Sequence, residues 1–333
     1  MLVVDEKMDA LLQSHSEQRT QLAKHESKLD MLLEQKGERD ARIDAKHHKQ
    51  RTIRQHEIEQ DEVVFQGRDE ASLLGGGSFS SVYRVQYHGS LKACKVITLK
   101  GHDREQRQKM VRDFEREMAI VCQLRHPHIV SVYGAAFGVE ELWLIMDLAE
   151  DGNLRTLLNR TQLTTEERLQ LVSDVALAFK FLHSRGVQHR DLKSPNILVF
   201  RENGKLRAKV TDFGLSRARS LLTSTATSTV KSIGSPAWSS PEYLRKEPIT
   251  DKSDVYSLGV VLWELLTLAQ PWQDHDVMQI MMAVALQNKS LAVPAEDEVQ
   301  PDLRKLRQVV LWCLQSLPVN RPTASQVAGA LGS

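Results

Sequence analysis

Two short motifs in the chain contain the residue types that phosphoryl transfer requires. The first is His189-Arg190-Asp191, followed by Lys193 and, five residues after Asp191, by Asn196. This reaction needs an oriented hydroxyl group, cations on the transferred group and a metal ion that neutralises phosphate charge. Asp191 could orient the hydroxyl, and Lys193 could hold the γ-phosphate. Asn196 offers a neutral oxygen ligand for Mg²⁺.

The second motif is Asp212-Phe213-Gly214. The Asp212 carboxylate is a hard oxygen ligand of the kind that Mg²⁺ prefers. Phe213 would provide a hydrophobic anchor and Gly214 a flexible hinge. Either motif alone is a weak signal, but together they predict a site that handles phosphate.

A glycine-rich stretch at 73–85 predicts a strand, a turn and a second strand that could cover phosphates. Gly75 and Gly77 have no side chains, so the backbone amides around them can approach phosphate oxygens closely. The stretch departs from the pattern G-x-G-x-x-G because Ser80 occupies the third glycine position.

Lys95 lies among apolar residues in the predicted strand "LKACKVITL". A lysine in such a place must find an anion, because otherwise it loses hydration without compensation. We expect Glu117, on a predicted helix at 104–124, to be its partner, with Glu115 as the competitor. An ion pair between Lys95 and Glu117 would hold the lysine against phosphates. The simpler alternative is a surface lysine whose stem lies along apolar side chains.

The elements that must position these motifs fall into two groups. From about 61 to 145 the chain is rich in strand patterns, interrupted by the helix at 104–124. After residue 150 the pattern is mostly helical, and Asn203-Gly204 predicts the turn of a β-hairpin. A β-rich part followed by a helical part indicates an α+β fold. The helices expected in the second part are 164–185, 251–269, 275–288, 303–315 and 323–331.

The first 60 residues contain no proline and no aromatic residue, which favours a long helix. A heptad register places apolar residues at seven of the ten a and d positions between Met1 and Leu32. We therefore expect a helical segment over 1–58 that could form a coiled coil, and a homodimer through residues 1–55. A single solvated helix is the alternative.

Bulk properties exclude several classes of protein. The chain has 333 residues and a net charge of +1, which gives no reason to expect nucleic acid as a partner. Its three cysteines are far apart and predict neither a disulfide framework nor a metal site. The N-terminal residues do not resemble a signal peptide, and the apolar stretch 255–269 is too short to span a membrane. We expect a soluble protein of the cytoplasm.

The order of the motifs, from the glycine-rich loop to "SPE" at 240–242, closely resembles that of eukaryotic protein kinases. The resemblance implies a two-lobed kinase domain over 61–333, with a β-rich N-lobe at about 61–146 and a helical C-lobe at about 150–333. It implies ATP and Mg²⁺ as cofactors and a protein as substrate. The mixed motifs resemble the tyrosine-kinase-like (TKL) group, and "DLKSPN" is similar to serine/threonine kinases. The site residues that the resemblance implies are Asp191, Lys193, Lys95 and Glu117 for catalysis, Gly75, Gly77, Val82, Ala93, Lys95, Met146, Asp147, Ala149 and Leu198 for nucleotide binding, and Asn196 and Asp212 for metal binding.

The same resemblance implies supporting contacts around the site. Glu242 would pair with Arg321, Asp254 would anchor the catalytic loop, and Ser235 would lie near Asp191. Regulation by phosphorylation of the Ser/Thr-rich segment 220–232, in the activation loop, is a further hypothesis. Stacking of Val121, Val132, His189 and Phe213 into one hydrophobic column is also implied.

Three other functions are compatible with parts of the sequence. Ser80 would suit a catalytically weak pseudokinase that serves as a scaffold and assembles through the N-terminal helix. Residues 1–55 would suit a module whose main role is oligomerisation. A small-molecule phosphotransferase of similar fold is the third, although the complete segment "GSPAWSSPE" at 234–242, where protein substrates would dock, argues against it.

Overall fold

The computed structural model describes residues 51, 53–69, 72–77, 80–212 and 235–332. The chain divides into two compact units, residues 1–55 and 56–333. All the site residues proposed from the sequence belong to the second unit. The heptad register at the N-terminus, the Ser/Thr-rich segment 220–232 and Phe213 lie outside the described residues.

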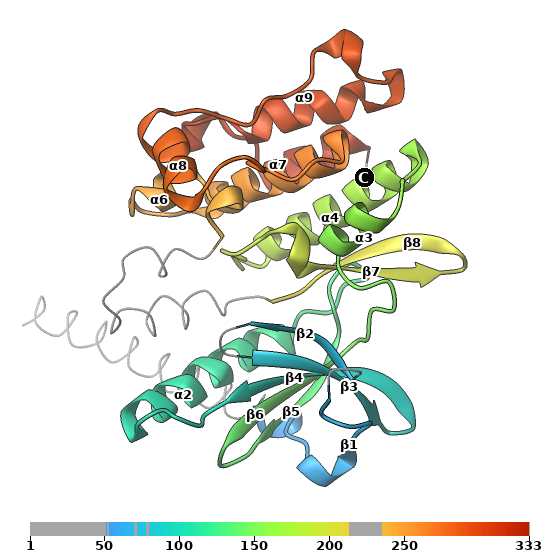
Figure 1. The fold of residues 1–333 in the computed structure, drawn as a ribbon, viewed down its shortest axis with the longest axis vertical. Helices are drawn as coiled ribbons and strands as arrows, with labels where there is room; N and C mark the ends of the chain where they lie inside the picture. Colours follow the sequence, from blue (N-terminus) through green and yellow to red (C-terminus); the bar gives the residue numbers. More distant parts are fainter. Residues whose placement is uncertain (1–50, 52, 70–71, 78–79, 213–234, 333) are drawn as a thin grey trace, which may run out of the picture. The chain divides into compact units, whose positions relative to one another are not determined.

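The first half of the second unit contains a six-stranded antiparallel sheet (Figure 1). Its strands lie in the order β1-β3-β4-β6-β5, and β2 pairs with the end of β3 that the β1 pairing leaves open. β-branched and aromatic residues are frequent in these strands, as expected for a pleated surface that is buried on one side. The strands are Val63–Phe65 (β1), Leu73–Gly77 (β2), Ser80–Tyr87 (β3), Ser90–Thr98 (β4), Val132–Phe137 (β5) and Glu141–Met146 (β6).

Helix α2, Arg104–Val121, packs against this sheet. Asp103 caps its first turn by accepting a hydrogen bond from a backbone amide, which satisfies one of the free donors at a helix start. Met110, Phe114 and Met118 recur at helical spacing and pack against the sheet. The predicted helix at 104–124 is therefore confirmed, although it ends three residues earlier.

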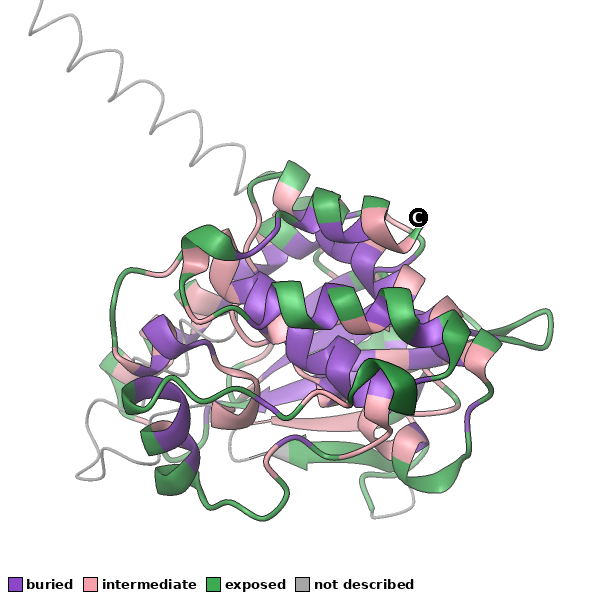
Figure 2. Ribbon diagram, turned by 90° about the horizontal axis from the view of Figure 1, so that it is seen from above, coloured by how far each residue is buried: buried purple, intermediate pink, exposed green. Residues whose placement is uncertain are grey.

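The second half is mainly helical, with a two-stranded hairpin on the side that faces the sheet (Figure 1). Helices α4 and α7 lie at its centre; most residues of α7 are buried, and α4 buries one face against the core (Figure 2). The hairpin turns at Asn203 and Gly204, which both have positive φ, as the sequence predicted. The elements are α3 (Leu154–Arg160), α4 (Thr165–Ser184), β7 (Ile197–Glu202), β8 (Lys205–Val210), α6 (Pro241–Leu244), α7 (Asp251–Thr267), α8 (Val277–Met281), α9 (Arg304–Cys313) and α10 (Ala324–Leu331).

Several element boundaries differ from the sequence predictions. The expected helix at 275–288 is a short α-helix, α8, which continues as a π-helical turn over Met282–Leu286. It begins at Val277 because Asp276 caps it. Helices α3 and α6 have seven and four residues, too few for a periodic pattern to be recognised. Single 3-10 turns occupy Gln60–Glu62, Ser194–Asn196, Pro236–Trp238, Glu296–Glu298, Pro301–Leu303 and Pro318–Asn320.

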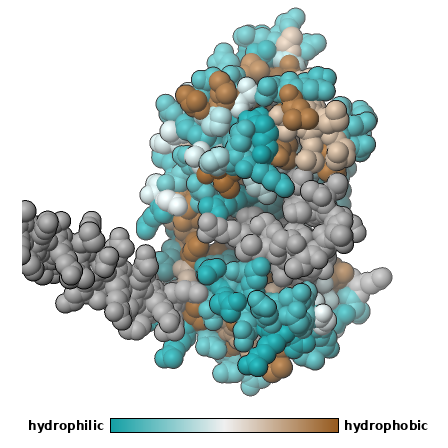
Figure 3. Space-filling view, turned by 90° about the vertical axis from the view of Figure 1, so that its left-hand side faces the viewer, coloured by the Kyte–Doolittle hydropathy of each residue, from teal (hydrophilic) through white to brown (hydrophobic). Residues whose placement is uncertain are grey.

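The expected α+β architecture with a β-rich N-lobe and a helical C-lobe is thus confirmed for the described residues between 56 and 332. Within the described residues, no helix has both the length and the apolar composition needed to cross a bilayer. On the face drawn in Figure 3, hydrophilic side chains predominate and hydrophobic ones form separate small groups. Cys94, Cys122 and Cys313 are buried and unpaired with one another.

Candidate active site

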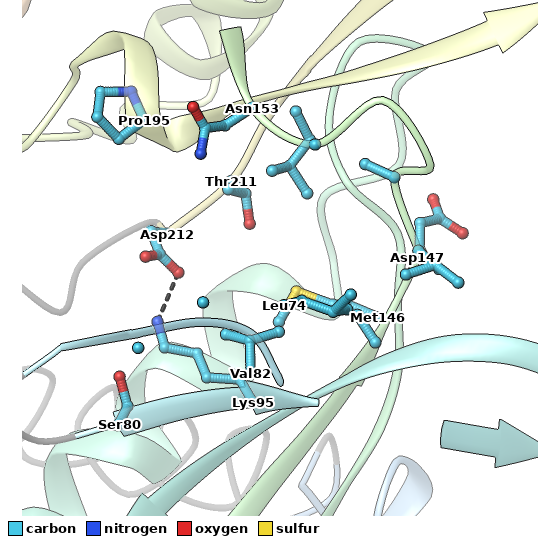
Figure 4. A pocket seen from close by; sticks show the side chains of 17 residues that line it. Leu74, Ser80, Val82, Lys95, Met146, Asp147, Asn153, Pro195, Thr211 and Asp212 are labelled. Atoms are coloured by element: carbon cyan, nitrogen blue, oxygen red, sulfur yellow. Dashed lines mark hydrogen bonds and ion pairs between the residues drawn. The ribbon is translucent and has the colours of Figure 1, made fainter. Parts of the chain in front are cut away.

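A cleft of about 320 Å³ lies between the sheet and the helical part (Figure 4). This volume falls within the range of roughly 300 to 1,000 Å³ that is typical of small-molecule sites. Strands β2, β3 and β4 form one wall, and the segment after β6 forms the side. The other wall consists of Leu198 on β7 and of residues that flank the hairpin β7–β8. The residues proposed from the sequence that line this cleft are Gly75, Val82, Ala93, Lys95, Met146, Asp147, Ala149, Leu198 and Asp212.

The glycine-rich stretch forms the edge of this cleft. Gly75 pairs with Val82, and Gly77 pairs with Ser80, where β2 meets β3. A Cβ atom added to Gly75 would meet nothing within 4 Å, so glycine here leaves open space beside the cleft. Ser80 lines the cleft, whereas Gly77 is not among the described residues that line it.

Lys95 projects from β4 into the cleft and is 3% exposed. Its Nζ lies 2.5 Å from Oδ1 of Asp212, which follows the end of β8 by two residues. Asp212 has a φ of +64°, a costly conformation for a residue that is not glycine, and such strain is commonly found at functional sites. Lys95 has therefore found the anion that its burial requires.

Among the described residues, the ion pair that the structure gives Lys95 is with Asp212, where the sequence suggested Glu117. Glu117 is buried on α2, at 7% exposure, but the carboxylate that contacts the Lys95 ammonium belongs to Asp212. The 2.5 Å contact with Asp212 neutralises the Lys95 ammonium group, and the role of Glu117 stays a prediction. Spacing in the sequence could not show whether Asp212 or Glu117 lies closer to the Lys95 ammonium group.

Asp254 on α7 holds the backbone of the loop that precedes β7. Its carboxylate accepts hydrogen bonds from the amides of His189, at 2.8 Å, and Arg190, at 2.7 Å. Arg190 has a φ of +66°, so two charge-assisted bonds stabilise a strained stretch of backbone. The predicted anchoring by Asp254 is confirmed, and it fixes the position of Asp191.

Asp191 forms one end of a short polar chain. Lys193 Nζ lies 3.1 Å from Oδ2 of Asp191 and donates to the Ser235 hydroxyl at 2.8 Å. The amide nitrogen of Asn196 donates to the Asp191 carbonyl at 2.8 Å. A carboxylate, an ammonium group and a hydroxyl therefore lie side by side, as predicted for Ser235, and this geometry can orient a hydroxyl group for attack.

Asn196 precedes β7 and Asp212 follows β8, so both lie at the open end of the hairpin, where the Thr211 amide donates to the Asn196 carbonyl at 3.0 Å. Their side chains supply one amide oxygen and one carboxylate, which fit Mg²⁺. No cluster of three or more His, Cys, Asp or Glu that could hold a metal ion exists among the described residues. Mg²⁺ is usually held by one or two carboxylates together with phosphate oxygens and water, so two protein ligands would be enough for it.

Two buried acidic side chains connect the segment 235–245 to the helical core. Glu242 forms a bidentate ion pair with Arg321, at 2.6 and 2.8 Å, as predicted. Burial raises the pKa of the Glu242 carboxyl, but the hydrogen bonds from Arg321 and Ser253 outweigh this and hold the pKa below its usual value. Through Glu242, the segment 235–245 is thereby fixed to Ser253 on α7 and to Arg321 in the loop before α10.

Glu264 on α7 is the second buried acid. Its carboxylate accepts hydrogen bonds from Ser194 at 2.7 Å, from Trp238 at 2.8 Å and from Arg155 at 3.0 Å. Burial raises the pKa of Glu264 to about 7, despite these donors. One side chain thus connects α3, the loop after Asp191 and the segment around Trp238.

Several cleft residues were not proposed from the sequence. Asn153 caps helix α3, and its position at the end of "EDGN" is a helix-start signal that could have been recognised. Thr211 could have been inferred from its place before Asp212. For the others, no local pattern distinguishes them from ordinary turn or strand residues. The additional lining residues are Leu74, Gly76, Ser80, Gly152, Asn153, Pro195 and Thr211, whereas Leu148 was implied by the kinase resemblance together with Asp147 and Ala149.

Comparison with known proteins agrees with this architecture. The sequence model of the protein kinase domain family matches residues 68–330, so the chain belongs to the protein kinase family. The serine/threonine-protein kinase CTR1 of Arabidopsis thaliana is 38% identical over 264 residues, which are 78% of this chain and 30% of CTR1. The serine/threonine/tyrosine-protein kinase HT1 of the same plant is 35% identical over 261 residues, which are 78% of this chain and 64% of HT1.

A third relative comes from an animal. The mitogen-activated protein kinase kinase kinase dlk-1 of Caenorhabditis elegans is 33% identical over 277 residues, 83% of this chain and 27% of dlk-1. The chain spans less than two thirds of the length of each of these three relatives. The predicted membership of the kinase family and its TKL group is confirmed, and the pseudokinase alternative is not favoured.

Proposed function

We propose that this chain transfers the γ-phosphate of Mg-ATP to serine or threonine hydroxyls of proteins. The observation that carries the proposal is the joint placement of Lys95 and Asp212 in the cleft and of Asp191 and Lys193 beside Ser235. Phosphoryl transfer depends mainly on positioning and on electrostatic stabilisation, and these groups supply both. The proposed kinase domain is 61–333, with an N-lobe at about 61–146 and a C-lobe at about 150–333.

Each side chain has a distinct proposed role. Asp191 orients the substrate hydroxyl and accepts its proton, while Lys193 lies against the transferred group. Lys95 binds the nucleotide phosphates, and Glu117 on α2 supports this part of the cleft. Asn196 and Asp212 would hold Mg²⁺, which neutralises phosphate charge when it is bound.

The nucleotide base would lie between apolar side chains of the two walls. Val82 and Ala93 come from the sheet, and Leu198 comes from β7. The backbone after Met146, over residues 147–149, is the proposed hydrogen-bonding partner of the base. Gly75 and Gly77 would let backbone amides approach the phosphates.

The class of hydroxyl is proposed from two features. Ser235 places a small hydroxyl next to Lys193 and Asp191, and "DLKSPN" resembles serine/threonine kinases. The names of CTR1 and dlk-1 describe a serine/threonine kinase and a kinase of protein kinases, whereas the name of HT1 includes tyrosine. Phosphoamino-acid analysis is therefore part of the test below.

Regulation and assembly are proposed for the parts outside the described residues. Phosphorylation within 220–232 would regulate activity. A homodimer through residues 1–55 would raise the effective concentration of two kinase domains and favour phosphorylation of one by the other. The three buried, free cysteines suit a reducing compartment such as the cytoplasm.

The decisive experiment measures transfer of ³²P from Mg-ATP to a generic protein substrate by the wild-type chain and by Asp191→Asn. We expect label on serine or threonine, and a decrease in kcat of about 10² to 10⁴-fold in the variant. Isothermal titration with Mg-ADP is the matched measurement, since Asp191→Asn should still bind nucleotide. Equal transfer by both proteins, or label on tyrosine alone, would contradict the proposal.

A further inference from the structure

The carboxylate of Asp147 points away from the reacting groups. Figure 4 shows its side chain directed away from Lys95 and Asp212, at the side of the cleft. Its Oδ2 accepts a hydrogen bond from the Ser131 amide at 3.1 Å, and the Asp147 amide donates to the Ser131 carbonyl at 3.1 Å. Asp147 and Ser131 are thus joined twice, so the backbone at Asp147 is fixed to the start of β5.

Tyr133 on β5 contacts the other oxygen of the same carboxylate. Its hydroxyl donates to Asp147 Oδ1 at 2.6 Å. Burial, together with the hydrogen bond to Asp147 and its charge, raises the pKa of Tyr133 to about 12. The hydroxyl therefore remains a proton donor throughout the physiological pH range, and a donor to a carboxylate makes a strong hydrogen bond.

Lys92 on β4 completes this cluster. Its Nζ lies 3.8 Å from Asp147 Oδ1 and 3.8 Å from the centre of the Tyr133 ring. The ammonium group therefore combines an ion pair with a cation–π contact. Lys92 on β4, Tyr133 on β5 and Asp147 after β6 join three neighbouring parts of the sheet. We call residues 147–149 the hinge and these three residues the hinge clamp.

The hinge clamp lies directly behind the wall of the cleft. Ala93, the residue after Lys92, lines the cleft and pairs with Met146. Val132, the residue before Tyr133, pairs with Met146 as well. Ala93, Met146 and Val132 thus lie side by side across β4, β6 and β5, and each of them is the sequence neighbour of one clamp residue. Movement of the clamp would displace the segment 147–149 relative to Ala93.

We propose that the hinge clamp is a positioning device for the nucleotide, which holds the backbone of residues 147–149 at the distance from Ala93 that the base requires. The inference rests on the proposed function, since the base is the group that this backbone would bind. A segment held in its bound conformation before binding loses less entropy when the ligand arrives. The clamp therefore acts on nucleotide affinity and not on the transfer step.

A purely structural role predicts a different result. The side chains of Lys92 and Asp147 are 18% and 16% exposed, and Tyr133 is 40% exposed. Polar contacts this close to solvent contribute little to overall stability. Loss of the clamp should consequently weaken nucleotide binding while the melting temperature stays nearly constant.

The test is the variant Tyr133→Phe, which removes one hydroxyl and keeps the ring. Isothermal titration should show that Mg-ADP binds about five-fold more weakly, with KM for ATP raised to the same extent and kcat changed by less than two-fold. Hydrogen exchange measured without nucleotide should be faster in a peptide that covers 147–149 and unchanged in one that covers α7. Lys92→Met should act in the same direction.

Two matched controls accompany the test. Tyr83→Phe removes a hydroxyl on neighbouring β3 that takes part in none of the hydrogen bonds between described residues, and Lys100→Met removes an exposed lysine paired with Glu140. Neither control should change nucleotide affinity. Unchanged exchange and affinity in Tyr133→Phe would overturn the clamp even if the wild-type chain is an active kinase. A wild-type chain that binds Mg-ADP but transfers no phosphate would instead overturn the proposed function, and the binding and exchange results would still decide on the clamp.

Discussion

Lys95 and Asp212 are 117 residues apart in the sequence, and their side chains meet at 2.5 Å in the cleft. Each was assigned a different target from the sequence, phosphate for the lysine and metal for the aspartate. In the structure they neutralise each other, so both charges are satisfied within a largely buried cleft. Under the proposed function, binding of Mg-ATP would exchange this ion pair for contacts with phosphate and metal.

Replacement of Asp212 by asparagine tests this exchange. We expect kcat to fall by about 10² to 10³-fold, because the variant lacks the carboxylate that is proposed to hold the metal ion, which would neutralise phosphate charge. The Mg²⁺ concentration for half-maximal rate should rise in the same variant. Asp251→Asn on α7, an aspartate outside the cleft, is the control. An Asp212→Asn variant with the wild-type requirement for Mg²⁺ would remove Asp212 from the proposed metal site.

The ion pair between Glu242 and Arg321 should be a large contributor to stability. Both side chains are almost completely buried, and removal of one partner leaves an uncompensated buried charge. We expect Arg321→Met to lower the free energy of unfolding by about 3 to 5 kcal/mol, measured by chemical denaturation. Because the pKa of Glu242 is lowered, the contribution of the pair is present above the ordinary glutamate pKa and is lost as the pH falls through the lowered value.

The control for that prediction is the exposed pair formed by Arg245 and Glu247, with N···O distances of 2.7 and 3.0 Å. Glu247→Gln should change stability by less than about 1 kcal/mol, since solvent screens the interaction. Equal costs for the buried and the exposed pair would contradict the role given to Glu242 and Arg321.

Glu264 predicts a pH dependence of stability. A glutamate whose folded pKa is about 7 binds its proton more tightly in the folded than in the unfolded protein. Its contribution is fully present below the ordinary glutamate pKa and is lost as the pH rises through about 7. A shift of this size corresponds to about 3 kcal/mol, so the wild-type chain should lose up to that amount between pH 5 and 8 relative to Glu264→Gln. Denaturation curves at pH 5, 6, 7 and 8 for both proteins measure the difference, and parallel pH profiles would show that Glu264 does not titrate in this range.

Gly134 on β5 makes room for the chain that precedes β1. The Ala135 amide and carbonyl are hydrogen-bonded to His56 and Ile58, and a Cβ atom on Gly134 would lie 2.5 Å from Ile58 Cγ2 and 2.8 Å from the His56 carbonyl. Gly134→Ala should displace this chain, destabilise the protein by about 1 to 3 kcal/mol and speed hydrogen exchange at Ile58 and Ala135. Gly329→Ala in α10 is the control, because a Cβ there meets nothing within 4 Å and alanine favours the helix. Equal free energies of unfolding for the two variants would show that residues 56–58 do not pack against β5.

Much of the fold could be predicted because its elements carry strong local signals. Helix α2 combines a capping box with apolar residues at helical spacing, and the hairpin β7–β8 has Asn-Gly at its turn. Helices α3 and α6 and the π-helical turn at Met282–Leu286 were missed because they are too short for a period to emerge, or because packing overrides local preference.

The sequence by itself determined the residue types and their order, and these were sufficient to predict a kinase-like site with Asp191, Asn196 and Asp212. The order of residues along the chain, however, does not show which acidic side chain a given lysine contacts. Asp212 and Glu117 are both acidic and both distant from Lys95, and only the tertiary structure decided that Asp212 contacts it. The same holds for Asp147, whose carboxylate faces Tyr133 and Lys92 rather than the cleft. Such choices depend on distances and on desolvation, which arise only when separate elements pack together.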